Sequence, residues 1–232
     1  MYLLTETASP FALERWAAFF ANFGQFAKGF FYTLGISIGA LIVALLLGLI
    51  FGAMSSTHNK ILRGISRVYV EIFQNTPLLV QFVVVFYGIS ILTDGHVMIP
   101  ISLTAILCVG VYTGAYISEI IRTGIEAVPK GQTEAALSQG FTYADTMRII
   151  ILPQAVRTIL PPLTNQVVNL IKNTSTVAII SGADIMFTAK SWAYDTTNYV
   201  PAFAGAAFLY FIMCFPLATW ARRKEEENKK AY

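Results

Sequence analysis

The chain has 232 residues, of which 56% are hydrophobic and only 12% charged, and its mean hydropathy is +0.62. This is more apolar surface than a soluble core of this size can bury, so the composition excludes a soluble globular protein and predicts a membrane protein. The net charge of +3 gives no case for nucleic acid as a partner.

Residues 1–30 are predicted to form an external interfacial segment. They open without a basic stretch, and residues 3–7 are acidic and polar, so we do not expect a cleaved signal peptide. Aromatic residues recur at near-helical spacing, which is typical of a helix lying in the outer headgroup layer. These are Phe11, Trp16, Phe19, Phe20, Phe23, Phe26 and Phe30.

Five stretches each exceed the roughly 20 residues that a helix needs to cross a bilayer core. Four of them carry no charge, and the remaining one carries only Lys172. The stretches are Phe31–Met54, Ile72–Thr93, Val97–Ser118, Thr158–Ala183 and Thr196–Ala221. We therefore predict an all-α integral membrane protein with five transmembrane helices. They make up a domain of residues 31–221, which is followed by a charged tail, 222–232.

The distribution of Lys and Arg predicts the orientation, because cytoplasmic connections carry the excess of positive charge. Connection 55–71 has three such residues, connection 119–157 has four and the tail has five, against three on the other side. We expect the N-terminus outside and the C-terminus inside, with the loop 122–157 in the cytoplasm.

The chain lacks the patterns of an enzyme. No nucleophile, base and orienting group stand at a plausible spacing, and no GxxxxGK[ST] segment is present to bind phosphate. Cys108 and Cys214 lie in different apolar spans, and His58 and His96 lie alone near opposite faces. We predict no catalytic residue and no metal site.

The loop 122–157 is predicted to fold into two short helices. Residues 132–139 are good helix formers, and Gly140 stands where that helix would end with a positive φ. Thr142, followed three residues later by Asp145, is a capping pair for a second helix running toward Pro153. A loop that folds by itself is typical of a docking element.

The same loop carries Glu134, Ala135 and Ala136 in succession, and Gly140 follows four residues after the last Ala. Ten residues after that Gly come Ile150, Leu152 and Pro153, as Ile-x-Leu-Pro. In these positions the chain resembles the permease subunits of ABC importers, whose cytoplasmic EAA loop has the same residues at the same offsets. The resemblance extends from Gly29 to Trp220. It implies a type I ABC importer permease with a cytoplasmic coupling helix, located in the inner, or cytoplasmic, membrane.

The resemblance also implies partners and a role for the loop. The partners are a second permease chain, identical or homologous, two ATP-binding subunits and an extracytoplasmic amino-acid-binding protein, assembled in the lipid bilayer. This chain would bind no cofactor itself, and ATP and Mg would bind to the partner ATPase. We expect the small Ala135 and Ala136 to pack into a cleft of the ATPase. Glu134 is expected to hold the bend by accepting hydrogen bonds from backbone N–H groups or Arg148.

Two further segments are similar to the polar amino acid branch of these permeases. Residues 75–81, Asn-Thr-Pro-Leu-Leu-Val-Gln, match its second span, although Gln74 stands where Arg is common. Gln81 needs a hydrogen-bond partner inside the membrane, and bundle packing and substrate contact both remain open. The third span carries Ala115, Tyr116, Glu119 and Arg122 in the pattern of that branch. Glu119 and Arg122 are expected to form a structural pair, with a gate hinge as the alternative. Tyr112, Tyr116 and Thr113 either line a translocation path or pack between helices.

Lys172 lies in the fourth predicted span, where an ionisable residue costs a few kcal/mol or more unless water, a counter-charge or a ligand meets it. A structural ion pair is one explanation. Because the other spans contain no buried carboxylate, we favour a polar cavity at the midplane, formed with Asn173, Thr174 and Ser175.

The surrounding Leu170–Ser175 resembles the Leu-Lys-Asp-Thr-Ser segment of amino acid permeases, with Asn173 in place of Asp. The absence of that acid favours a neutral or acidic polar cargo such as glutamine or glutamate. Two alternatives stay open. One is a permease for another solute, such as a cationic amino acid, cystine or a peptide, and the other is an uncoupled membrane scaffold.

Overall fold

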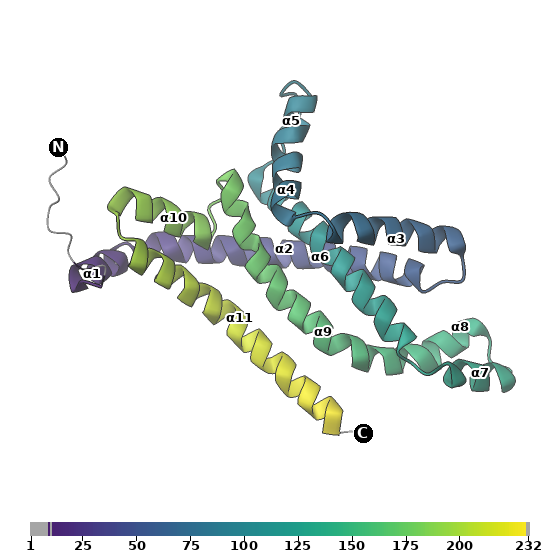
Figure 1. Ribbon diagram of the computed structural model, residues 1–232. Helices are drawn as coiled ribbons and strands as arrows, with labels where there is room; N and C mark the ends of the chain where they lie inside the picture. The colour runs from purple at the N-terminus through teal and green to yellow at the C-terminus, as the bar shows by residue number, and fades with distance from the viewer. Residues whose placement is uncertain (1–8, 10, 231–232) are drawn as a thin grey trace.

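The structure is a computed structural model that describes residue 9 and residues 11–230, apart from the side chains at 225 and 227–230. All of its regular elements in this part of the chain are helical, as predicted. The helices α1, α2, α10 and α11 meet at one end of an elongated molecule, and α7 and α8 form the opposite end (Figure 1). The first two helices are α1 (Leu13–Ala21) and α2 (Phe23–Ser55).

The long helices α2 and α6 (Ile101–Glu126) form the central pair of the molecule. Their contact depends on glycine. A Cβ on Gly48 would lie 2.4 Å from Ile117 Cγ2, and a Cβ on Gly110 would lie 2.7 Å from Val43 Cβ. Because real Cβ atoms do not approach other atoms this closely, the two helices can pack at this distance only with glycine at these positions.

The second predicted span, Ile72–Thr93, is not one helix. Ile72 belongs to α3 (Lys60–Gln74), which occupies most of the connection expected at 55–71 and lies along α2. The chain then breaks and continues as α4 (Leu78–Val83), the π-helical turn η1 (Val84–Gly88) and α5 (Ile89–Leu92), at 97° to α3. Pro77 explains the break, because it has no N–H to donate and disfavours a helical residue before it. Figure 1 shows α4 and α5 projecting from the body of the molecule.

The second half of the chain runs from the α7–α8 end to the α1 end and back (Figure 1). The fourth predicted span, 158–183, lies in α9 and η3, and α9 contains Pro161 and Pro162 in its interior. The predicted tail, as far as it is described, continues α11 as a helix. The remaining elements are α7 (Lys130–Ser138), α8 (Tyr143–Asp145), the π-helical turn η2 (Thr146–Ile151), α9 (Leu152–Asn173), the 3-10 helix η3 (Thr174–Ile180), α10 (Ile185–Thr196) and α11 (Tyr199–Lys230).

Within the described residues, three helical stretches are long and apolar enough to cross a membrane: Phe23–Ser55, Ile101–Glu126 and Tyr199–Lys224. The bent pair of Lys60–Gln74 with Leu78–Leu92 makes a fourth if it counts as one span. The fold is therefore that of a helical membrane protein with three to four candidate spans. The first of them begins at Phe23, eight residues before the predicted start at Phe31, because α2 extends into the predicted interfacial segment.

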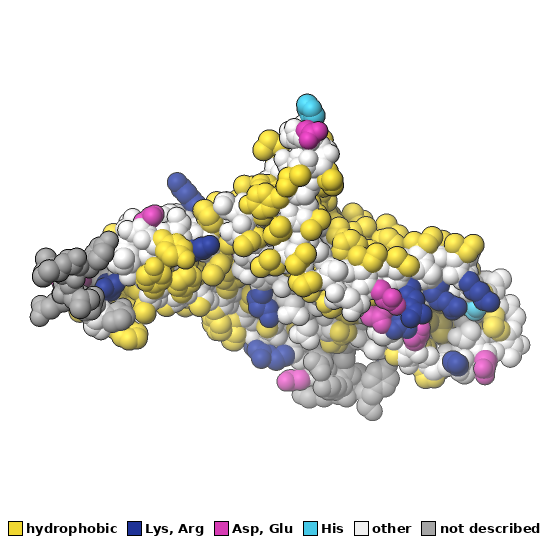
Figure 2. Space-filling model, turned by 45° about the horizontal axis from the view of Figure 1, so that its top comes forward, with side chains coloured by type: hydrophobic (Ala, Val, Ile, Leu, Met, Phe, Trp, Pro, Cys, Tyr) yellow, Lys and Arg dark blue, Asp and Glu magenta, His cyan; other side chains and the backbone are white. Residues whose placement is uncertain are grey.

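Two apolar cores hold the helices together. One lies between α2, α4, α6 and η3, and the other joins α1, α10 and α11 to the start of α2. In the second core Phe19 and Phe26 pack edge to face against Trp192, while Phe11 and Phe20 remain largely exposed. Part of the aromatic set predicted for the headgroup layer thus lies inside the protein. Figure 2 shows hydrophobic side chains over much of one face, with a dense group of charges toward the α7–α8 end.

Candidate functional site: a coupling loop and a polar membrane segment

The loop between α6 and α9 folds into the two short helices that the sequence predicts. Helix α7 covers residues 130–138, slightly earlier than the predicted 132–139. Gly140 follows with φ of +87°, in the left-handed region that glycine tolerates, so this prediction is confirmed. The Phe141 N–H donates to the carbonyl of Ala136, and the Gly140 N–H donates to that of Leu137, which closes the end of the helix.

The cap of the second helix is also confirmed. The Asp145 N–H donates to Thr142 Oγ1 over 3.1 Å, and the Thr142 hydroxyl donates to Asp145 Oδ2 over 2.6 Å. The helix runs toward Pro153 as expected and continues beyond it. The π-helical turn η2 leads directly into α9, in whose first turn Pro153 lies.

Glu134 does not hold the bend. Within the described residues its carboxylate forms no hydrogen bond or ion pair, because Gly140 and Thr142 already close the turn through local contacts. Glu134 instead lines a hollow of about 740 Å³ between the α2–α3 turn and the loop. His58 of that turn packs edge to face on Tyr143 of α8, with ring centroids 5.0 Å apart.

The small residues of the EAA motif differ in exposure. Ala136 is 3% exposed and packs within the chain itself, so it is not available to an ATPase cleft in this structure. Ala135 lies on the exposed side of α7, and Leu137 is 47% exposed beside it. Leu152 and Pro153 are exposed at the start of α9. Ala135, Leu152 and Pro153 are thus exposed, while Leu137 lines the same hollow as Glu134.

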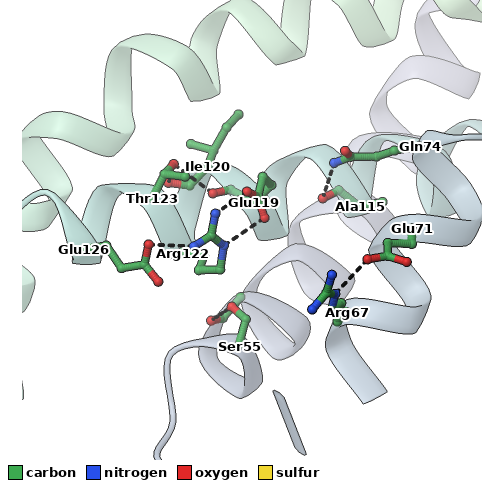
Figure 3. A network of polar contacts seen from close by, with 11 residues as sticks. Ser55, Arg67, Glu71, Gln74, Ala115, Glu119, Ile120, Arg122, Thr123 and Glu126 are labelled. Atoms are coloured by element: carbon green, nitrogen blue, oxygen red, sulfur yellow. Dashed lines mark hydrogen bonds and ion pairs between the residues drawn. The ribbon is translucent and has the colours of Figure 1, made fainter. Parts of the chain in front are cut away.

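A charged groove of about 860 Å³ runs beside the loop, between α3 and α6. The predicted pair is present there: the Arg122 guanidinium donates from Nε to Glu119 Oε2 over 3.0 Å (Figure 3). Arg122 also contacts Glu126 Oε2 at 2.5 Å, a partner that sequence reasoning missed although it lies four residues on. On the α3 wall, Arg67 Nε lies 2.7 Å from Glu71 Oε1, and Gln74 donates to the Ala115 carbonyl.

Gln81 has partners inside the protein. Its Nε2 donates to Thr76 Oγ1 over 2.8 Å and to the carbonyls of Thr76 and Phe73, so it ties the two sides of the break before α4. Thr113 is fully buried in α6, and its hydroxyl has no partner in the described structure. Tyr116 is half-buried and its hydroxyl lies 3.1 Å from that of Tyr112. These three residues are not brought together in one open site.

Lys172 lies at the end of α9, where the polar segment Lys172–Ser175 passes into η3. The side chain is exposed and forms no ion pair within the described residues. Its place in the last turn of a helix suits a cation, because the carbonyl end of the helix dipole is negative. Asn173 is half-buried, while the hydroxyls of Thr174 and Ser175 donate to carbonyls of their own turn.

A cavity of about 320 Å³ lies beside Lys172, with Ser175 and Tyr210 in its wall. The rest of its lining is apolar, and Asn173 and Thr174 do not line it, so the polar cavity expected from these residues is not formed as predicted. Tyr210 leads to a residue that the sequence analysis missed. Its hydroxyl donates to Asp184 Oδ2 over 3.0 Å, and the fully buried Asp184 caps α10 by accepting from the N–H groups of Met186 and Phe187. A buried carboxylate is thus present one residue beyond the fourth predicted span, and it bonds to Tyr210 and not to Lys172. The N-cap position of Asp184 was readable from the sequence, but Tyr210, 26 residues away, was not.

A helical membrane protein with a self-folded loop at one end, and with a lysine that has no ion pair within the described residues beside a cavity, has the features of a membrane transport component. The family model of the binding-protein-dependent transport system inner membrane component matches residues 44–225, well over half of the chain. The chain belongs to this family. As a permease subunit it works with a separate subunit that hydrolyses ATP.

Individual relatives are similar over most of their length. The chain is 37% identical to the probable glutamine ABC transporter permease protein GlnM of Bacillus subtilis, covering 92% of this chain and 97% of that protein. It is 33% identical to the glutamate/aspartate import permease protein GltJ of Escherichia coli, covering 82% and 85%. The crystal structure of an amino acid ABC transporter with histidines matches with a TM-score of 0.84 and 31% identity, covering 91% and 98%.

Proposed function

We propose that this chain is the permease subunit of an ATP-driven importer of polar amino acids, and that its cargo is a neutral or acidic amino acid such as glutamine or glutamate. The observation that carries the proposal is Lys172, a cation without a counter-charge in the described structure, beside a cavity in the membrane part of the fold. A lone ammonium group attracts a carboxylate. The names of the glutamine and glutamate/aspartate relatives support the same class of cargo.

The cargo would bind near the junction of α9 and η3. Its carboxylate would pair with Lys172, while Asn173 and the hydroxyls of Thr174 and Ser175 offer neutral hydrogen-bonding groups once they turn from their own backbone. A cationic side chain would find no free acid here, because all three contacts of Asp184 are made within the protein. Gln81, Thr113 and Tyr116 would then support the fold around the path.

The proposed topology has five spans, with the N-terminus outside and the C-terminus inside. The excess of Lys and Arg in connection 119–157 and in the tail supports it, as does the passage of α9 and η3 back to the α1 end. The bent pair of α3 with α4 and α5 serves as the second span, and α9 with η3 serves as the fourth. The fourth lacks the apolar character of a lipid-facing helix because it carries the polar segment.

The proposed complex contains two permease chains, identical or homologous, two ATPase subunits and an extracytoplasmic amino-acid-binding protein. ATP and Mg would bind to the ATPase subunits, and the coupling residues Glu134, Ala135, Gly140, Leu152 and Pro153 would contact them or set the shape of the loop. The self-contained fold of the loop supports this role, because it presents a defined surface without help from the rest of the bundle.

Replacing the charge at Lys172 tests the proposal. Lys172→Met keeps the length and apolar stem, so the protein should remain in the membrane while glutamine or glutamate uptake falls by about tenfold or more, as expected for loss of a charge-assisted contact. Lys60→Met is the matched control, because Lys60 is an exposed lysine at the start of α3. Normal uptake by Lys172→Met would remove the substrate site. Loss of the protein from the membrane would instead indicate a structural role.

The cargo class is tested by restoring the missing acid. Asn173→Asp should let arginine compete for uptake, because a poorly hydrated carboxylate prefers an ammonium or guanidinium group to an amide. Since the binding protein selects cargo first, stimulation of the ATPase by free amino acids should be measured with the same binding protein present. An unchanged preference, with transport intact, would contradict this assignment of Asn173.

A further inference from the structure

We propose that the groove between α3 and α6 is the cytoplasmic release route of the importer, and that it takes the amino acid as a zwitterion. The proposal rests on the proposed transport function and topology. It assigns to this groove a ligand class, a molecule that carries one ammonium and one carboxylate group a few ångströms apart.

Helix α3 has three different faces. Ser66 and Tyr69 are buried against α2 and α6: the Ser66 hydroxyl donates to the Phe51 carbonyl, and the Tyr69 hydroxyl donates to that of Val111. A second face is apolar and about half exposed or more, as a lipid-facing surface should be. It consists of Ile61 (73% exposed), Ile65 (50%), Val68 (58%) and Ile72 (52%). The third face carries Arg63, Arg67, Glu71 and Gln74 and lines the groove.

The charged face is too long to serve only the membrane surface. The charges on this face run from Arg63 to Glu71, eight residues, which is about 12 Å along a helix at ~1.5 Å per residue. Because the exposed apolar face of the same helix, from Ile61 to Ile72, brackets this length, the proposed topology places these charges beside the hydrocarbon layer. Ionised side chains in contact with lipid are costly, so the groove has to open to water or be covered by protein.

The opposite wall presents charges of both signs in alternation. Arg122 is held between Glu119 and Glu126 on α6, and the pair Arg67–Glu71 lies on α3 (Figure 3). The groove lining contains four Lys or Arg residues, Arg63, Arg67, Arg122 and Lys130, and three Glu residues, in addition to His58. The charges therefore nearly balance, and Arg67 and Arg122 are each paired with at least one of the three Glu residues.

A balanced lining of this kind suits a zwitterion better than a simple ion. A carboxylate that pairs with Arg122 frees Glu119 or Glu126, and the ammonium group of the same molecule can pair with the freed acid. No charge is then left without a partner inside the membrane. A lone cation or anion would displace one member of a pair and leave the other unpaired. Acidic and basic side chains also follow one another at short intervals along the walls, which lets the molecule pass from one to the next along the groove.

The position of the groove fits release. It lies at the end of the molecule that carries the coupling loop, and Ser56, His58, Glu126 and Lys130 line both the groove and the hollow that contains Glu134. A change in the docking of the loop would therefore reach the mouth of the groove directly.

The route is tested by cysteine labelling of opposite faces of α3. In the assembled permease and ATPase complex, with Cys108→Ala and Cys214→Ala as background, Arg67→Cys and Gln74→Cys are compared with Val68→Cys and Ile72→Cys. A charged methanethiosulfonate reagent of about amino acid size is added at the cytoplasmic side. We expect the groove positions to react at least roughly tenfold faster, because the reagent reaches thiols only through water. Millimolar glutamine or glutamate should slow labelling of Gln74→Cys severalfold.

Equal reactivity on the two faces would overturn the proposal, and so would groove positions that never react, which would show another protein chain covering the groove. Labelling itself does not require transport. If uptake is fast but the groove cysteines do not react, the release route is wrong and the transport assignment stands. If uptake is absent but the groove cysteines react and amino acid protects them, the result counts against the transport assignment.

A charge exchange gives a second readout. Glu119→Arg alone, or Arg122→Glu alone, should lower the maximal uptake rate by about tenfold, as expected when one charge is left unpaired. The double exchange should recover most of the rate, while the concentration of loaded binding protein giving half-maximal uptake stays unchanged in all three. If both single variants transport at the wild-type rate with normal membrane levels, the charge pairs do not serve the passage of the cargo.

Discussion

The coupling loop and the Lys172 segment are both polar, but they satisfy their polar groups in opposite ways. In the loop the partners lie close in sequence: Gly140 and Phe141 donate to carbonyls of α7, and Thr142 caps α8. Around Lys172 the hydroxyls bond to their own helix, the charge has no counter-ion in the described structure, and the cavity wall is completed by Tyr210 from α11. The first region can keep its shape while it moves as a unit. The second depends on the packing of distant helices.

The largest effect is expected from Gly140→Val, which strikes the local closure of the loop. A β-branched residue at φ of +87° costs on the order of 1–3 kcal/mol and would displace α8 relative to α7. Transport and binding-protein-stimulated ATP hydrolysis should both fall by about tenfold or more at unchanged membrane level. Gly131→Val is the control, since Gly131 has open space around its Cβ position and an ordinary φ. Coupled transport at the wild-type rate would show that the loop tolerates a different shape.

Among the remaining variants, which are read out as changes in stability, the largest effect is expected from Asp184→Ala, which disrupts the packing between distant helices. It removes the cap of α10 and the acceptor of the Tyr210 hydroxyl, and should destabilise the purified permease by about 2–3 kcal/mol. Thermal unfolding in detergent measures the loss. Asp184→Asn keeps an oxygen acceptor, so its loss of unfolding free energy should be less than half of the loss in Asp184→Ala. Equal losses in the two variants would mean that the carboxylate charge, and not the cap, is required.

Thr142→Ala should cost about 1 kcal/mol, the usual value of an N-cap, and should leave the Lys172 region intact. Thr142→Ser is the control that retains the hydroxyl. Hydrogen exchange of the amides at residues 143–145 should rise in the alanine variant alone. Faster exchange around residues 172–175 would contradict the separation of the two regions.

The smallest effect is expected from Tyr210→Phe, at about 0.5–1.5 kcal/mol, because only one hydrogen bond is lost and the ring remains. Its value lies in double-variant cycles. Combined with Asp184→Ala it should show a coupling of at least about 0.5 kcal/mol, whereas Thr142→Ala with Asp184→Ala should be additive within about 0.5 kcal/mol. Additivity in the first pair would show that Tyr210 and Asp184 do not act together.

This contrast explains which features the sequence made predictable. The ends of α7, the positive φ of Gly140, the Thr142 cap and the Glu119–Arg122 pair each depend on residues at most four positions apart, so their spacing was sufficient. The apolar content also identified the membrane class. Seven positions at fixed offsets, in the EAA loop and the residues after it, pointed to the family that the comparisons show.

The errors arise where an interaction spans a greater distance. Hydropathy merged Ile72–Gln74 with the apolar residues beyond Pro77, although α3 packs on α2 and Gln81 fastens the break from the other side. The expected bonds of Glu134 were assigned to a turn that closes without it. The pairing of Asp184 with Tyr210 was overlooked because Tyr210 lies in α11, and nothing in the local pattern of either residue indicates the contact.

The glycine contact between α2 and α6 has a mechanical consequence. With Ile117 seated over Gly48 and Val43 over Gly110, neither helix can slide along the other without driving a side chain into a backbone. The two helices therefore act as one stiff lever, joined at its end to α7 through a short turn. A displacement of the loop is therefore transmitted along the α2–α6 pair with little deformation of the two helices. Flexing is left to the break in the chain before Pro77, between α3 and α4.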